Sequence, residues 1–293
     1  MNPAPYPSAT LIYFSPTHNT QKVLRAIAQG MGLEQTVELD LTSPAARSNP
    51  LPPVTSDLLV VGMPVYEAHL PALTLPILKK LEGRGQPAVV VVVYGNVGFG
   101  HALQELAAVA GERGFQVVAG AAFIGEHSFS YDRLPLALGR PDQEDLRTAR
   151  SFGERITAKL NDLPPVPAKK GMSMPGTLPL IPSILPPNSS ALFAHPPVLK
   201  AEACNHCGAC VQACPVGAID PDDLRIDGSK CLRCFTCRQG ALKISLRNKW
   251  ISYPFLKASG IRSHPQVPGA VRRPTAFCAA ERRIDIRPFP PAG

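Results

Sequence analysis

The chain has 293 residues, of which 45% are hydrophobic and 18% are charged, and its formal net charge is +8. A chain of this length and apolar content can form two domains and bury a core, which excludes a disordered protein. Seven of its eight cysteines lie between residues 204 and 237. Their short, repeated gaps are typical of thiolate ligands and not of a disulfide framework, so we expect a reducing, cytoplasmic location.

The apolar segments predict no membrane anchor. The N-terminus lacks a basic start followed by an apolar stretch, so we expect no export signal. The longest purely apolar run, residues 88–93, is far too short to span a bilayer and suits a buried strand. We therefore expect no transmembrane segment.

Residues 10–125 alternate short apolar runs with helix-like stretches, which indicates strands connected by crossover helices in a parallel sheet. Near-continuous Val and Leu in the third and fourth runs indicate strands covered on both faces. The sequence therefore predicts a doubly wound α/β domain with a five-stranded parallel sheet. The expected strands are residues 10–14, 36–41, 57–62, 88–94 and 115–123, and the expected helices lie near 19–31, 70–82, 99–113 and 142–161.

A hydroxyl-rich loop follows the first expected strand, at the sheet edge where such domains bind ligands. It reads Ser15-Pro16-Thr17-His18-Asn19-Thr20 and opens directly into a helix. Unpaired N–H groups and the helix dipole favour an anion at such a place, which makes the loop a candidate phosphate site. The alternative is a simple N-cap, with Thr17 or Asn19 satisfying the first helix donors.

This loop resembles the phosphate loop of flavodoxins, and the resemblance covers residues 9–162 as a domain. It implies FMN, with the phosphate held by Ser15, Thr17, His18, Asn19 and Thr20. His18 departs from the family pattern, which prefers glycine there. Its side chain either crowds the phosphate or, when protonated, adds a charge-assisted hydrogen bond.

Two further loops follow the third and fourth strands, and in flavodoxins these loops enclose the isoalloxazine ring. The resemblance makes Tyr66 the stacking candidate, and glycine between the strands and helices lets backbone amides approach a flat ring. The residues so assigned to the ring are Pro64, Val65, Tyr66, Tyr94, Gly95, Asn96 and Phe99.

His127 follows the fifth strand at the same edge of the sheet. It is a proton donor to a reduced flavin, a gate to the neighbouring cluster, or a hydrogen-bonded structural histidine. The sequence shows no nucleophile constellation and no Gly-x-Gly-x-x-Gly fingerprint for a dinucleotide.

Prolines then become frequent from residue 163 to residue 199, which indicates an extended linker. Apolar residues between 178 and 193 are too numerous for a freely solvated tether, so we expect parts of the linker to pack on the first domain. The predicted units are a flavodoxin-like domain at 1–162, the linker at 163–199, an iron–sulfur domain at 200–246 and a basic tail at 247–293.

Two cysteine runs follow the linker. The first contains Cys204, Cys207, Cys210 and Cys214, the last followed by proline, and the second contains Cys231, Cys234 and Cys237. The triple repeat with Cys-Pro has the bacterial iron–sulfur spacing. Structural zinc is the alternative, because zinc also binds Cys-x-x-Cys pairs.

Residues 204–219 resemble the first half of two-cluster ferredoxins, but the second half lacks its fourth cysteine and proline. The crossed ligation of that family implies one complete [4Fe-4S] site, held by Cys231, Cys234, Cys237 and Cys214. It leaves Cys204, Cys207 and Cys210 as a second site that has only three thiolate ligands. That second site holds a [3Fe-4S] cluster, holds an open [4Fe-4S] cluster, or recruits Cys278, which is otherwise a plain buried thiol.

The tail carries the positive charge of the chain. Eleven of the 30 Lys and Arg residues follow position 237, against two of the 22 Asp and Glu residues. Such a segment docks an acidic redox partner, binds anionic lipid or stays unstructured. Nucleic acid is less favoured, because no recognised binding module accompanies the charge.

The combined resemblance is to flavodoxin–ferredoxin fusion proteins. It implies an electron carrier that passes single electrons between iron–sulfur clusters and a flavin or a partner redox enzyme, rather than an enzyme with its own substrate. Two alternatives remain open: a flavin-free docking or assembly protein for a partner reductase, and a flavin-dependent reductase of a small substrate.

Overall fold

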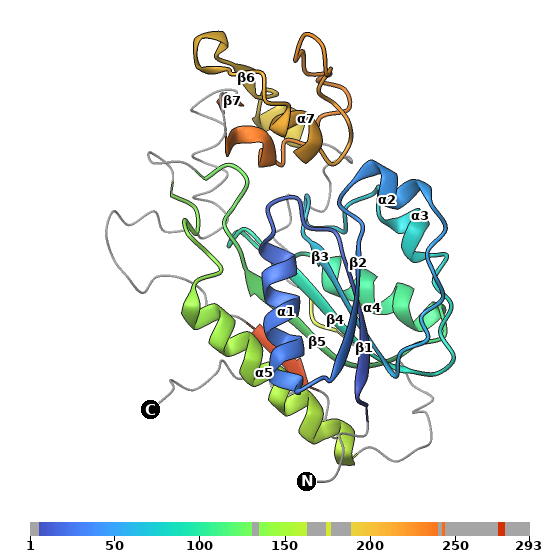
Figure 1. Ribbon diagram of the computed structural model, residues 1–293. Helices are drawn as coiled ribbons and strands as arrows, with labels where there is room; N and C mark the ends of the chain where they lie inside the picture. The colour runs from blue at the N-terminus through green and yellow to red at the C-terminus, as the bar shows by residue number, and fades with distance from the viewer. Residues whose placement is uncertain are drawn as a thin grey trace.

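The computed structural model describes residues 6–130, 135–162, 174–176, 189–239, 242–243 and 275–278. Its centre is a sheet with the strand order β2-β1-β3-β4-β5-β8 (Figure 1). The first five strands pair in parallel, and 2-1-3-4-5 is the flavodoxin-like doubly wound order. The predicted sheet is confirmed, with strands β1 Ser8–Tyr13, β2 Gln35–Asp40, β3 Leu58–Pro64, β4 Pro87–Tyr94 and β5 Gln116–Ile124.

The sheet has a helix layer on each face, which explains why its central strands are apolar throughout. All eight residues of β4 are buried. Val90 and Val92 pack in one core cluster with residues of α4 Ala102–Glu112, whereas Val89 and Val91 pack with residues of α1 Asn19–Met31 and α5 Gln143–Asp162. Alternate side chains of one strand thus enter two cores, so neither face tolerates a polar residue.

The helix expected near 70–82 is much shorter than predicted. Only α3, Leu75–Leu78, is helical there, and another short helix, α2 Pro44–Ser48, follows β2. Pro76 lies within the first turn of α3. Proline has no N–H and fits a helix only in its first turn, so the helix begins late. The residues before it form a loop at the sheet edge.

A sixth strand, β8 Thr275–Cys278, pairs antiparallel with β5 and was not predicted. It comes from the basic tail. Four residues are too few to show the alternation of apolar and polar side chains that would predict a strand.

A second, smaller unit lies beyond the carboxyl edge of the sheet (Figure 1). We call residues 197–239 the cysteine module. Its small core contains Cys214, Ala218, Ile219 and Leu224. Strand β6 Val198–Leu199 of the module pairs with β7 Leu242–Lys243, which follows it. The module also contains the short helices η2 Ala201–Ala203, α7 Ala209–Ala213 and η3 Thr236–Gln239. Another short helix, α6 Ser190–Phe193, precedes the module.

Part of the proline-rich linker packs on the first domain. Met174 is buried, and its carbonyl accepts a hydrogen bond of 2.9 Å from Nε2 of Gln104. The apolar residues at 178–185 lie outside the described residues, so the domain boundaries stay a prediction. Among the described helices, none has the length and apolar character needed to cross a membrane.

Helices α1 and α5 cross with their backbones in contact. A Cβ atom built on Gly153 would lie 2.2 Å from the carbonyl oxygen of Ile27. We expect Gly153→Ala to lower the free energy of unfolding by about 1–3 kcal/mol, because the helices must move apart. Gly111→Ala is the matched control in α4, where nothing lies within 4 Å, and it should raise stability by about 0.4–1 kcal/mol. Urea unfolding followed by circular dichroism measures both; equal effects would contradict the close crossing.

Candidate functional site

A cavity of about 710 Å³ opens at the carboxyl ends of β1, β3, β4 and β5. Its volume is typical of a site for a small molecule or cofactor, and its place is where doubly wound domains bind ligands. Part of its wall comes from the cysteine module, through Ser229, Lys230, Leu232, Arg233 and Cys234. The cavity therefore lies between the two units of the chain.

The loop after β1, residues 15–20, supplies the polar end of the cavity, and we call it the phosphate loop. Ser15, Thr17, Asn19 and Thr20 line the cavity. The hydroxyl of Ser15 accepts a hydrogen bond from the N–H of Gln21 at 3.1 Å. Ser15 thus caps α1, whereas the predicted alternative gave this role to Thr17 or Asn19.

His18 is the N-cap residue of α1 and has a φ of 61°. Glycine adopts this left-handed conformation without a steric cost, which explains why a related loop favours glycine here. The side chain is exposed and does not line the cavity. In this structure His18 therefore neither crowds nor contacts the place predicted for the phosphate.

The loops after β3 and β4 supply the apolar walls. Of the seven residues assigned to the ring, the cavity is lined by Pro64, Val65, Tyr66, Tyr94 and Gly95. Phe99 is instead buried in the core, with its ring centroid 5.5 Å from that of Tyr94. It supports the wall without lining it.

Gly95 and Asn96 show why the loop after β4 has its sequence. A Cβ atom on Gly95 would lie 2.4 Å from Cδ2 of His127, so no side chain fits there without displacing His127. Asn96 has a φ of 62° and does not line the cavity. Its Oδ1 atom is buried with no hydrogen-bond partner in the described part of the chain. A buried acceptor without a partner is costly, but because Asn96 is not part of the cavity wall, its Oδ1 atom does not point to a ligand there.

Several wall residues were not predicted. His69 and Glu105 line the cavity, with Nδ1 of His69 in contact with Oε1 of Glu105, and the other carboxylate oxygen accepts the N–H of Leu70 at 2.9 Å. Ser189 also lines the cavity, and its buried hydroxyl has no partner among the residues described. These residues come from distant parts of the chain, and no local motif marks them.

His127 lines the cavity beside Gly95. Its Nδ1 atom accepts a hydrogen bond of 3.0 Å from the N–H of Phe129, which requires an unprotonated Nδ1. Burial lowers the pKa of His127 to about 4. The imidazole is therefore neutral near pH 7, which fits a structural histidine and leaves it without a positive charge for the site.

The thiols of Cys214, Cys231, Cys234 and Cys237 are neighbours, and Cys210 also interacts with Cys237, so the crossed ligation stays a prediction. Burial raises the pKa of Cys234 to about 12, and the nearby thiols of Cys237, Cys214 and Cys231 raise it further. Burial likewise raises the pKa of Cys237 to about 12. Four thiolates this close are stable only beside cationic metal. The donor set of Cys214, Cys231, Cys234 and Cys237 therefore fits an iron–sulfur cluster.

The other three cysteines lie nearer the solvent. Cys207 is exposed, and Cys204 and Cys210 are half-buried. Among the described His, Cys, Asp and Glu side chains, no group of three converges on a single metal ion. A cubane cluster is larger than one ion, so its ligands lie further apart.

The structure does not bring Cys278 to the three-cysteine site. Its backbone pairs with Ala119 in β5, whereas β5 meets the cavity just beyond Ile124. At about 3.3 Å per residue, that is roughly 16 Å back along the strand, on the first domain.

Direct contacts fix the cysteine module on the flavodoxin-like domain. The hydroxyl of Thr236 donates to the carbonyl of Pro16 in the phosphate loop. The rings of Phe235 and Phe129 meet edge to face, with centroids 5.8 Å apart. Arg238 pairs with Glu126 at 2.7 Å. Phe235 and Thr236 lie between Cys234 and Cys237, and Arg238 directly follows Cys237, so the segment expected to bind the cluster also forms the interface.

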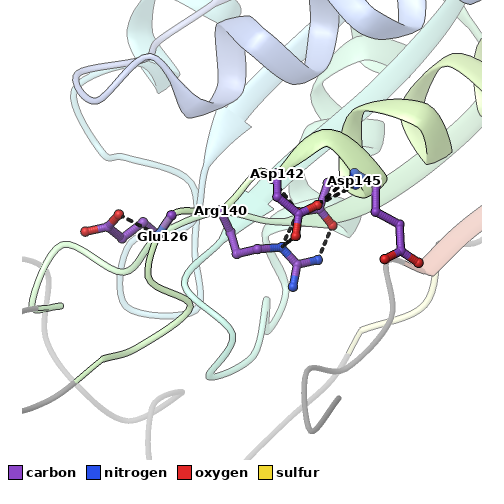
Figure 2. A network of polar contacts seen from close by, with 6 residues as sticks. Glu126, Arg140, Asp142 and Asp145 are labelled. Carbon is purple, nitrogen blue, oxygen red and sulfur yellow. Dashed lines mark hydrogen bonds and ion pairs between the residues drawn. The ribbon is translucent and has the colours of Figure 1, made fainter. Parts of the chain in front are cut away.

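The first domain holds its side of this interface with a polar network (Figure 2). Arg140 pairs with the buried carboxylate of Asp145 and, at 3.3 Å, with Asp142. The carbonyl of Arg140 accepts the N–H of Glu126 at 2.8 Å. The loop carrying Glu126 is thereby attached to the start of α5, so Glu126 meets Arg238 from a fixed position.

The two units of the chain are similar to different known proteins. Residues 197–220 match the family model of the 4Fe-4S binding domain, which includes the first four cysteines. No curated protein matches the sequence. Together with the strand order of the sheet, the family match confirms the predicted joining of a flavodoxin-like fold to an iron–sulfur domain.

Similar solved structures include a flavodoxin from the domain Archaea, which is 16% identical, covers 53% of this chain and 99% of that chain, and has a TM-score of 0.37. Flavodoxin 2 from Bacillus cereus is 15% identical over 52% of this chain and 99% of that chain, with a TM-score of 0.38. A rubredoxin oxygen:oxidoreductase from Desulfovibrio gigas is 16% identical over 54% of this chain and 37% of that chain, with a TM-score of 0.39.

The depressed pKa of His127 predicts a pH dependence of stability. An unfolded histidine has a pKa of about 6.5, so between about pH 6.5 and pH 4 the unfolded chain binds more protons. Stability is therefore fully present above pH 6.5 and falls as the pH falls, by on the order of 1–3 kcal/mol. His127→Asn keeps an acceptor but does not titrate, so its unfolding free energy should fall less steeply in this window. Parallel urea-unfolding series would contradict the assignment if both proteins gave the same slope.

Proposed function

We propose that the protein is an electron carrier in which a [4Fe-4S] cluster exchanges single electrons with FMN bound in the cavity. Cys234 carries the proposal, because it belongs to the four-cysteine donor set and also lines the cavity. A ligand of the cluster would thus lie in the wall of the flavin site. When bound, the cluster carries one electron at a time, and FMN accepts or donates one or two.

The residues of the cavity have separate tasks in this proposal. The phosphate loop would bind the FMN phosphate with backbone N–H groups and the hydroxyls of Ser15, Thr17 and Thr20. Tyr66 and Tyr94 would hold the ring system. The cysteine module closes the cavity with Leu232 and Cys234, which keeps water from the space between the cofactors.

The three-cysteine site gives the module a second, outward side. Cys207 is exposed, whereas Cys234 is buried at the cavity. We propose that Cys204, Cys207 and Cys210 hold a second, three-thiolate cluster that exchanges electrons with a partner redox protein. This arrangement would lead electrons from the surface through the module to the flavin, or in the opposite direction.

A flavin-dependent reductase is the second candidate, and the pair of His69 and Glu105 favours it. Glu105 holds Nδ1 of His69 in the cavity wall, which leaves the other ring nitrogen to accept a proton from a substrate, or to donate one when both ring nitrogens are protonated. Small-molecule turnover with a chemical reductant, lost in His69→Asn, would support this candidate over a carrier. The buried hydroxyl of Ser189, which lines the cavity without a partner among the described residues, speaks against a flavin-free scaffold.

Anaerobic reconstitution tests the proposal directly. Iron, sulfide, zinc and flavin are counted per chain while the visible spectrum is recorded. About four or more iron atoms with stoichiometric FMN would support the carrier. Iron without flavin, even when FMN is offered, would leave the first domain as a docking scaffold. Zinc in place of iron would overturn the redox function.

Cys214→Ser tests the assignment of ligands. Although Cys214 belongs to the first cysteine run, we expect its loss to destroy the cluster nearest the cavity, because its thiol lies beside those of Cys231 and Cys234. Low-temperature electron paramagnetic resonance and iron content report the result. Cys207→Ser is the matched comparison, and it should affect only the second cluster. The crossed assignment is wrong if Cys214→Ser keeps the iron content and resonance signals of the wild type.

A further inference from the structure

The flavin site is incomplete without the cysteine module. Ser229, Lys230, Leu232, Arg233 and Cys234 all line the cavity. They belong to the segment that contains the second group of cysteines or directly precede it. A flavin in the cavity would therefore contact a wall whose conformation depends on the cluster ligands.

The backbone of this wall needs support. We call residues 231–238 the cluster loop. Arg233 and Phe235 both have a φ of 55°, a left-handed conformation that costs free energy for residues other than glycine. Cys231, Cys234 and Cys237 alternate with these positions. Ligation of the three thiolates by one cluster would hold the cluster loop in this conformation.

The same loop reaches the phosphate loop. The buried side chain of Thr236 donates its hydroxyl proton to the carbonyl of Pro16, and Phe235 packs on Phe129 beside His127. Arg238 also donates to the carbonyl of Ser130. Three contacts thus transmit the position of the cluster loop to two of the loops around the cavity.

We propose that cluster assembly and flavin binding are thermodynamically linked through the cluster loop, with Thr236 as the residue that positions the phosphate loop. The inference rests on the proposed binding of FMN and a cluster. Linkage is reciprocal, so a cluster that raises the affinity for FMN is itself retained more strongly when FMN is bound.

The test measures the dissociation constant of FMN for the full chain under anaerobic conditions, by quenching of FMN fluorescence. Cys214→Ser removes the cluster without substituting any residue of the cavity wall, because Cys214 does not line the cavity. We expect its dissociation constant to rise by about 5- to 150-fold over that of the cluster-loaded protein. Asp223→Asn, on the exposed surface of the same module, is the control and should leave it unchanged.

A second pair of variants keeps every cysteine, so the test stands even if Cys214→Ser misfolds. Thr236→Val should raise the dissociation constant by about 2- to 10-fold through loss of one hydrogen bond, whereas Thr236→Ser should restore it. FMN should also slow the loss of iron to a chelator in the wild type. Equal FMN affinity with and without the cluster, with no effect of Thr236→Val, would overturn the linkage but leave the carrier proposal standing. An absence of FMN binding in every form would overturn both.

Discussion

The contact between the cluster loop and the phosphate loop is the constraint on which the arrangement depends. Thr236 and Phe235 lie between two cysteines of the donor set, and they meet Pro16 and Phe129 on the first domain. A segment of eight residues therefore serves as domain interface and cavity wall, and it is also the proposed ligand loop. Few substitutions in it would change one of these roles without changing the others.

The conformation of this segment depends on the protonation and ligation of its buried thiols. Burial raises the pKa values of Cys234 and Cys237 to about 12, so without metal the thiols stay protonated at neutral pH. In the proposed cluster, Cys231, Cys234 and Cys237 would bind iron as thiolates in place of their protons, and this ligation would cross-link the loop. A cross-linked loop would hold Arg238 in a fixed position for its ion pair with Glu126.

Local patterns in the sequence predict much of this molecule. The continuous valines of β4 indicate a strand covered on both faces, and the Cys-x-x-Cys repeats identify the thiolates without any knowledge of the fold. The polar loop after β1 is predictable because its hydroxyl and amide side chains are adjacent in the sequence. The short α3, in contrast, was not predicted, although Pro76 in its first turn agrees with its late start.

What the sequence does not predict depends on contacts between distant segments. Phe99 follows a cavity loop and looks like a wall residue, yet packing against Tyr94 draws it into the core. The turn conformation at His18 directs its side chain outward, away from the assigned phosphate. Ser189, His69 and Glu105 join one wall from separate parts of the chain, and Cys234 reaches the cavity only because the module docks on the sheet edge.

Intramolecular electron transfer is the central claim, and its rate tests it most directly. The flavin of the reconstituted protein is photoreduced by a short light pulse under anaerobic conditions, and the arrival of the electron at the cluster is followed in the visible spectrum. The account predicts a first-order rate that is independent of protein concentration, because Cys234 joins both sites within one chain. A rate proportional to protein concentration, or no transfer at all, would contradict it.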